Sequence, residues 1–282
     1  MLLSEMERRF KDGDDSLEPN AVVYNAVIHA WAANGEPGSA ERCESLLYRM
    51  KDMAREGNED VKPDVITWNS VLDAWAKSRE YGSAERCEGI LRKMEDQYVD
   101  SGDRDVKPNA VTFNSVIHAW ANAEGPGSGV RAERLLDRMI ELSEAGDGDV
   151  SPTAYTFSSV IDAHAKSTRK DCGERAEEIL GRLSELYLET GKKVLRPNAV
   201  TYSAVLNAWA KSEKGLTPPR AEALLRQMSA AMGGTMGSRG ELAASNKAFD
   251  LAVRELDQST DEDTVARIEL MRQRNILRSI RP

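Results

Sequence analysis

The sequence predicts an all-α fold, an α/α superhelical solenoid of stacked helix-turn-helix repeats. A stretch such as "PNAVVYNAVIHAWA" occurs five times, at prolines that lie 44 or 45 residues apart: Pro19, Pro63, Pro108, Pro152 and Pro197. Within each copy, large apolar residues recur at the spacing of one helix face. Self-similarity at a fixed period in this range is typical of solenoids, in which each unit packs against its neighbours.

The first helix of each repeat begins two residues after the proline, so we count repeat positions from residues 21, 65, 110, 154 and 199. Positions four, seven, eight and eleven follow the pattern i, i+3, i+4, i+7, which places them on one buried face. Position eleven holds Trp31, Trp75, Trp120, His164 and Trp209. We expect Trp75 and Trp120 to join neighbouring repeats.

A Gly/Pro/Ser break separates the first helix from a second one, represented by "AERCESLLYRM". Cys43 and Cys87 occupy a position where the other repeats have alanine, which indicates that both cysteines are packing residues. The second helices close at Met50, Met94, Met139, Leu183 and Met228. An acid-rich loop then leads to the next proline, which prevents the helix from continuing.

The two ends of the chain differ from this pattern. Residues 1–20 are predicted to form the second helix of a truncated repeat, and residues 21–228 form the five repeats. Residues 229–282 are predicted to contain a Gly/Met/Ser loop and two amphipathic helices that cap the stack, because the ends of a solenoid need a polar outer face.

Composition excludes several classes of protein. The chain has 282 residues, a formal net charge of -9 and three cysteines, too few and too scattered for a disulfide framework or a zinc site. No apolar run approaches the length that crosses a bilayer, and no targeting segment is visible. The acidity argues against a protein that coats nucleic acid through bulk positive charge.

The patterns "VTYNxLIxAxxK" in the first helix, "AExLLxxM" in the second and the exit "KPD" or "KPN" resemble the pentatricopeptide repeat family over about residues 1–228. The family's unit is shorter than the repeats found here, and the extra residues fall in the turn and in the loop before the proline. The resemblance implies a non-catalytic protein that binds single-stranded RNA without a cofactor. It also implies a role in organellar RNA processing, stability or translation, in mitochondria or plastids.

Three repeat positions form a candidate binding face. Position five carries compact hydrogen-bonding groups that are poor helix formers, which suits reading an unpaired base: Asn25, Asn69, Asn114, Ser158 and Ser203. Position two offers groups that could sandwich a base: Val22, Ile66, Val111, Tyr155 and Val200. Position thirteen carries Lys77, Lys166 and Lys211, which could contact phosphates. The helix dipole, which favours a cation at the C-terminal end of a helix, explains these lysines equally well.

The resemblance also implies a rule in which position five and the final residue of a repeat together select a base. The pairs are Asn25 with Asp64, Asn69 with Asn109, Asn114 with Thr153, and Ser158 with Asn198, whereas Ser203 has no recognisable partner. The rule implies uracil for the first pair, a pyrimidine for the second, no assigned base for the third and adenine for the fourth.

Two alternatives to RNA binding differ in their support from the sequence. Catalysis or metal binding is disfavoured because His29, His118 and His164 have no cysteine or carboxylate at ligand spacing. The stronger rival is a scaffold that holds a protein or peptide on the same face, which the acidic charge favours. Neither the RNA binder nor the protein scaffold requires a membrane or a small-molecule substrate.

Overall fold

The computed structural model describes residues 2–231, 247–252, 254, 266, 268–270 and 273, and within these ranges the regular structure is helical. The chain divides into two compact units. One unit comprises Met1–Ala123 with Asp147–Val150, and the other comprises Glu124–Gly146 with Ser151–Pro282. The division therefore falls inside the third repeat, between its two helices.

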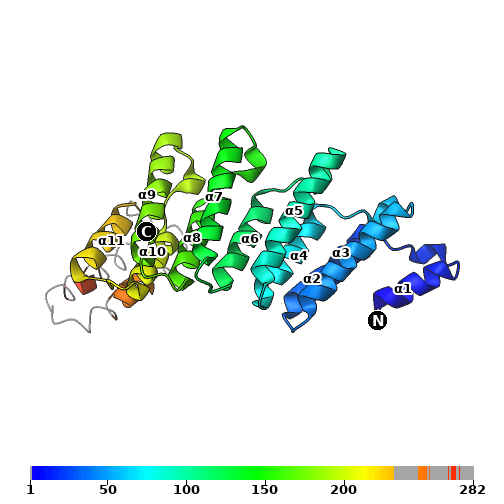
Figure 1. The fold of residues 1–282 in the computed structure, drawn as a ribbon, viewed down its shortest axis with the longest axis horizontal. Coiled ribbons are helices and arrows are strands. Elements are labelled where there is room, and N and C mark those ends of the chain that lie inside the picture. The colour runs from blue at the N-terminus through cyan, green and yellow to red at the C-terminus, as the bar shows by residue number, and fades with distance from the viewer. Residues whose placement is uncertain are drawn as a thin grey trace. The chain divides into compact units, whose positions relative to one another are not determined.

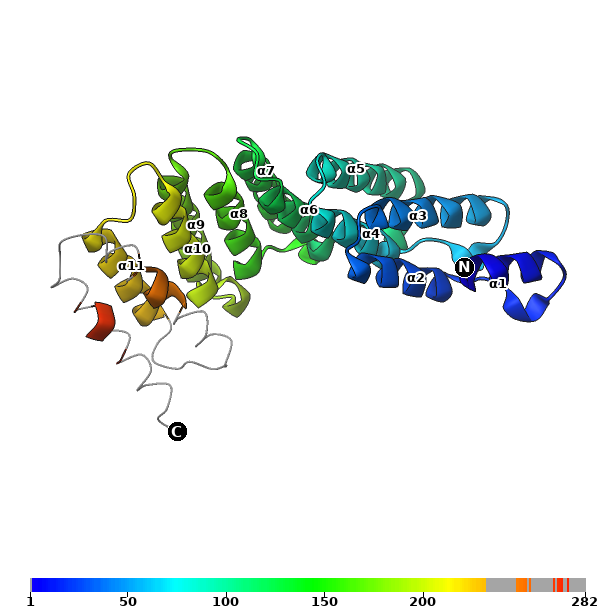
Figure 2. The ribbon, with the colours of Figure 1, turned by 90° about the horizontal axis from the view of Figure 1, so that it is seen from below.

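The first unit is a stack of helical hairpins (Figure 1). Its helices are α1 (Leu2–Lys11), α2 (Ala21–Asn34), α3 (Ser39–Arg55), α4 (Val65–Ser78), α5 (Ser83–Ser101) and α6 (Ala110–Asn122). Helix α4 packs against α2, α3, α5 and α6. Figure 2 shows α2 and α4 in one layer and α3 and α5 in another, so first helices and second helices are segregated within this unit.

The second unit repeats the arrangement. It contains α7 (Ser128–Glu144), α8 (Ala154–Lys166), α9 (Cys172–Thr190), α10 (Ala199–Lys211) and α11 (Pro218–Ala231). Helix α8 packs against α7, α9 and α10, and α10 packs against α9 and α11. The predicted all-α repeat fold is thereby confirmed.

Each first helix begins at the residue from which its repeat is counted, because the residue after the proline caps it. The capping residues have extended backbone conformations, as N-caps do: Asn20, Asp64, Asn109, Thr153 and Asn198. The four Asn and Asp side chains accept from backbone N–H groups of the first turn, as when Asp64 Oδ1 accepts from Thr67 N at 2.9 Å. A Pro-Asn or Pro-Asp pair thus marks the start of the first helix of a repeat.

The acid-rich loops contain an element that the sequence pattern did not predict. A short 3-10 helix precedes each repeat: Asp15–Leu17, Glu59–Val61, Arg104–Val106, Gly148–Val150 and Lys193–Leu195. In four of them the last residue is a buried apolar side chain: Val61, Val106, Val150 and Leu195. The residues that lengthen these repeats therefore build a packed turn.

Small and aromatic side chains fill the core as expected. Position four is buried in every repeat: Tyr24, Trp68, Phe113, Phe157 and Tyr202. Cys43 and Cys87 are fully buried, with Sγ donating to the carbonyls of Ile28 at 3.4 Å and Leu72 at 3.7 Å. Burial raises the pKa of the Cys43 thiol to about 11, so this thiol stays protonated. The packing interpretation of both cysteines is confirmed.

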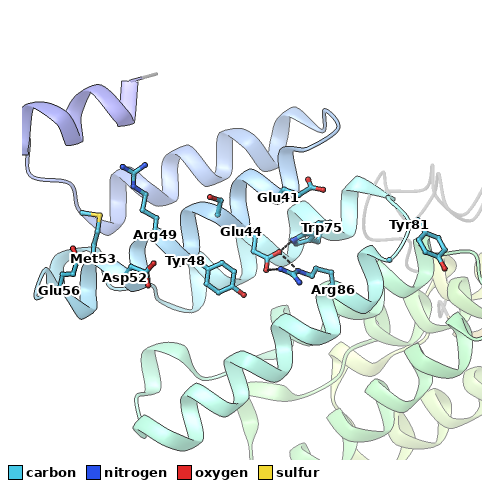
Figure 3. A pocket seen from close by; sticks show the side chains of 12 residues that line it. Glu41, Glu44, Tyr48, Arg49, Asp52, Met53, Glu56, Trp75, Tyr81 and Arg86 are labelled. Atoms are coloured by element: carbon cyan, nitrogen blue, oxygen red, sulfur yellow. Dashed lines mark hydrogen bonds and ion pairs between the residues drawn. The ribbon is translucent and has the colours of Figure 1, made fainter.

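A polar contact links successive repeats inside each unit. Position 22 is arginine and position 24 is glutamate in all five repeats. Glu44 of α3 accepts from Trp75 Nε1 at 2.9 Å and from Arg86 Nε at 2.8 Å, and Figure 3 shows these three side chains converging from α3, α4 and α5. The glutamate of one repeat therefore holds the position-eleven ring and the arginine of the next.

The same contact explains why histidine replaces tryptophan in the fourth repeat. His164 is buried, and its Nε2 lies 3.1 Å from Glu133 Oε2 of α7. Arg175 Nε donates to the same oxygen at 2.9 Å. His164 thus takes the structural place of a tryptophan N–H donor.

The predicted capping helices lie mostly outside the described residues. Residues 247–252 are helical, and Ala248, Phe249 and Ala252 are buried. Among the helices that the structure describes, none is long and apolar enough to cross a membrane.

Candidate nucleic-acid interface

The position-two side chains are exposed on every first helix. The exposed fractions are 75% for Val22, 55% for Ile66, 56% for Val111, 58% for Tyr155 and 52% for Val200. All five lie in the first turn of their helices, next to the capping residue. Isolated exposed apolar residues are common, but the same position exposed in five successive repeats indicates a shared task.

The position-five side chains are less exposed than those of position two. Ser158 is 6% exposed, and Asn25, Asn69, Asn114 and Ser203 are half-buried. At the junctions inside one unit, the next repeat covers position five, because the first turn of its first helix packs beside this position. Asn69 is therefore only partly accessible on the candidate binding face.

At the first junction, a threonine connects the predicted base-reading pair. The hydroxyl oxygen of Thr67 lies 2.7 Å from Asn25 Oδ1 and 2.9 Å from Asp64 Oδ1. The backbone N–H of Asp64 donates to the same hydroxyl at 3.3 Å. Thr67 is fully buried, so this bridge is shielded from water. Position five and the final residue are thereby held in one network.

At the second junction, the predicted pair is in direct contact. Asn69 Nδ2 donates to Asn109 Oδ1 at 3.4 Å. Asn109 Oδ1 also accepts from Val111 N at 3.0 Å and from Thr112 N at 3.1 Å. Asn69 Oδ1 is buried and has no hydrogen-bond partner among the described residues.

The fourth repeat shows a third version of the network. Ser158 Oγ donates to the carbonyl of Ala154 at 2.8 Å and lies 3.0 Å from Thr201 Oγ1. Thr201 Oγ1 is 3.3 Å from Asn198 Oδ1. The remaining predicted pair is divided between the two units, with Asn114 in α6 and Thr153 at the start of α8.

Two of the predicted phosphate-binding lysines are neutralised within their own helices. Lys77 Nζ lies 2.6 Å from Asp73 Oδ2, and Lys166 Nζ lies 2.7 Å from Asp162 Oδ2. Positions nine and thirteen are four residues apart, the spacing of ion pairs along a helix. The third predicted phosphate-binding lysine, Lys211, has an exposed side chain.

The histidines do not gather into a site. His29 and His118 lie on α2 and α6, and His164 is paired with Glu133. The described residues contain no group of three or more His, Cys, Asp or Glu side chains that could hold a metal ion.

Sequence reasoning missed the bridging residue at position three. This position is Thr67, Thr112, Thr156 and Thr201, with Val23 as the exception. All four threonines are fully buried. The signal was present, because a hydroxyl kept at the third residue of a helix after Asn, Asp or Thr is typical of a capping box.

A groove lies on the second helices of the first unit. It is an open groove along α3 and α5, lined by Glu41, Tyr48, Asp52, Glu56 and Tyr81 among others (Figure 3). Four carboxylates and two guanidinium groups line it, and the guanidinium of Arg86 is already bound to Glu44. The groove is anionic and is distinct from the row of position-two side chains.

The helices and their junctions define a helical-repeat protein with a repeated polar network beside an exposed apolar row. Two family descriptions match the chain: a pentatricopeptide repeat domain at residues 50–122 and a pentatricopeptide repeat at residues 22–53. The two matches together cover residues 22–122, where the chain contains pentatricopeptide repeats, and the predicted resemblance is confirmed there. Repeats of this family generally bind RNA and are typically non-catalytic. No curated protein matches the chain.

Proposed function

We propose that this protein is a modular, sequence-specific binder of single-stranded RNA. The observation that carries the proposal is the exposed position-two row lying beside the polar network of position five and the capping residue. An apolar or aromatic side chain can stack on a base, while an adjacent amide or hydroxyl contacts the base edge. Each repeat then binds one nucleotide.

In this proposal, the protein acts by occupying its RNA and needs no cofactor. Shielding, remodelling or recruitment on an organellar transcript, in processing, stability or translation, fits such a binder. The proposed location is the mitochondrion or plastid, where proteins of the family are commonly found. The proposed sequence, read 5′ to 3′, is uracil, a pyrimidine, an unassigned base and adenine.

Changing Ile66 to Glu is expected to weaken RNA binding by about tenfold or more, because base stacking contributes about 1–3 kcal/mol per base. Ile66 is exposed in the first turn of α4, where a carboxylate is compatible with the helix dipole, so the fold should be preserved. The measurement is fluorescence anisotropy of a labelled RNA of the proposed sequence at about 50 and 200 mM salt.

Val99→Glu is the matched control. Val99 is 78% exposed in α5, away from the first helices, and the variant has the same net charge. We expect an affinity within about twofold of the wild type, because general repulsion from one distant charge is small. Equal losses in both variants would argue that charge, and not the position-two row, governs binding.

Changing Asp73 to Asn should strengthen RNA binding a few-fold at low salt. The change removes the carboxylate that neutralises Lys77 and leaves the ammonium group available to a phosphate. Each added phosphate contact steepens the salt dependence by about 0.7 in logarithmic slope for a single strand. Asp52→Asn is the control, because Asp52 pairs with Arg55 on α3. A gain from Asp52→Asn as large as that from Asp73→Asn would contradict the phosphate role of Lys77.

The anionic groove along α3 and α5 favours a second candidate function, a scaffold for a protein or peptide. A basic segment would match its carboxylates. Absence of any salt-sensitive complex between the wild-type chain and RNA would favour this scaffold over the RNA binder.

A further inference from the structure

The groove along α3 and α5 is acidic because both of its arginines are neutralised by glutamates. The guanidinium of Arg49 pairs with Glu7 of α1, and that of Arg86 pairs with Glu44 of α3. Three further carboxylates line the groove and are exposed: Glu41, Asp52 and Glu56. The groove therefore carries more negative charge than its own arginines balance.

The three exposed carboxylates are available to a ligand. In the described part of the chain, Glu41 and Glu56 form no ion pair, and Asp52 forms one, with Arg55 at 3.2 Å. Both side chains of that pair are well exposed, at 67% and 72%. An exposed pair of this kind contributes little, so a ligand can replace it at small cost.

Acidic side chains recur at position 32 of the first four repeats: Asp52, Asp96, Glu141 and Glu185. All four are exposed, and they lie near the C-terminal ends of helices that end at residues 55, 101, 144 and 190. The helix dipole favours a cation at this end and disfavours a carboxylate. Helix stability therefore does not explain the recurrence, which indicates that these carboxylates serve a ligand.

The groove follows the whole length of α3 (Figure 3). The residues of α3 along it recur every three or four residues, from Glu41 through Ser45, Tyr48 and Asp52 to Glu56. Glu41 and Glu56 are separated by about 22 Å along the helix axis, at 1.5 Å per residue. A second helix that lies along α3 meets these side chains at the same spacing, as when a helix binds in a groove. The shape thus fits a helical segment.

Two tyrosine rings add apolar contacts to the groove. Tyr48 lies in the middle of the α3 face, and Tyr81 is fully exposed in the turn before α5. The Nζ atom of Lys93 lies 5.0 Å from the centre of the Tyr48 ring, so this ring already binds a cation. Guanidinium groups stack on such rings and also pair with carboxylates through two hydrogen bonds. This combination favours arginine in the ligand.

We propose that the groove is the docking site for a basic helical segment of a partner protein, whose arginines meet Glu41, Asp52 and Glu56 and whose apolar face meets Tyr48. This inference rests on the second candidate function, the scaffold, and names its partner. It does not depend on RNA binding, because the groove lies on second helices. The position-two row lies on first helices, which form a separate layer of the first unit (Figure 2).

The test measures the fluorescence anisotropy of a labelled alanine-based helical peptide of sixteen residues mixed with the full chain. Arginine at its first, fifth, twelfth and sixteenth residues matches the spacing of Glu41, Asp52 and Glu56 in either direction, and leucine at its eighth and ninth residues faces Tyr48. The wild type should bind this peptide at about 50 mM salt and bind it more weakly at about 200 mM. A peptide of the same composition with arginines all around the helix should bind about fivefold more weakly.

A neutralising variant tests the carboxylates directly. Asp52→Asn combined with Glu56→Gln should weaken binding of the matched peptide about fivefold, as expected for the loss of two exposed ion pairs. Glu36→Gln combined with Asp105→Asn is the matched control, because it changes the net charge equally at exposed sites of the first unit outside the groove. We expect the control to bind within about twofold of the wild type. Circular dichroism melting checks that each variant is folded.

A charge-reversed variant tests whether the contact is direct. Lysine in place of Glu41, Asp52 and Glu56 should abolish binding of the arginine peptide. The same variant should bind a peptide with glutamate in place of the four arginines, which the wild type should not bind. Such an exchange of ligands requires that these three side chains touch the peptide.

Three results would overturn the inference: a wild type that does not bind the matched peptide, equal binding of the matched and rearranged peptides, or equal losses from the groove and control variants. Dimers of the peptide-free chain that Asp52→Asn with Glu56→Gln abolishes, seen by sedimentation, would instead identify a second copy as the occupant and overturn the partner protein. RNA binding is measured separately. None of these results bears on the proposed RNA binding, and a chain that binds no RNA would leave this inference standing.

Discussion

Changing Trp75 to Ala is expected to lower the free energy of unfolding by about 3–5 kcal/mol, as for other large truncations in cores. Trp75 is 8% exposed in α4, and its Nε1 donates to Glu44 on α3. Truncation leaves a cavity between two repeats and removes one of the donors to a buried carboxylate. Urea denaturation followed by circular dichroism measures the loss.

Two companion variants separate the contributions. Trp75→Phe keeps most of the ring but removes the N–H donor, so a smaller cost of about 1–2 kcal/mol is expected. Asn69→Ala should change stability by no more than about 1 kcal/mol, because its one hydrogen bond is long, at 3.4 Å. A greater loss from Asn69→Ala than from Trp75→Ala would show that the helix faces are assigned wrongly.

The fold was predictable because its determinants repeat. Five copies of one apolar pattern define the buried face of the first helix, and a proline followed by a capping residue marks where each helix begins. The 3-10 turns were not predictable in the same way, since three residues have no periodicity. Only the recurrence of Val61, Val106, Val150 and Leu195 two residues before each proline signals that these segments are packed.

The residue types of the candidate site could be predicted from the sequence, but the burial of their side chains could not. Asn25 and Asn69 stand out in sequence because poor helix formers recur at one position. Their burial depends on the next repeat, whose threonine lies more than 40 residues away in sequence. The pairing of Lys77 with Asp73 could have been foreseen from their spacing, and it weakens the case for Lys77 as a ready phosphate ligand.

Changing Glu133 to Gln is expected to cost about 3 kcal/mol, because removing one partner of a buried ion pair leaves the others uncompensated. Glu133 is 6% exposed and binds His164, Arg175 and Arg182. Burial alone would raise the pKa of its carboxyl, but hydrogen bonds from His164 and Arg175 outweigh burial and hold the pKa at about 2. The carboxylate form is therefore the one that the fold stabilises.

The same carboxyl should make stability depend on pH. Its pKa is about 2 in the folded chain and 4.5 as the ordinary value, so its contribution is complete above about pH 4.5 and is lost as the pH falls toward 2. The difference in unfolding free energy between the wild type and Glu133→Gln should therefore shrink over this range. Glu185→Gln, at an exposed position of α9, should keep the wild-type dependence. A constant difference between wild type and Glu133→Gln from pH 6 to pH 3 would mean that ionisation of Glu133 does not stabilise the junction between the repeats.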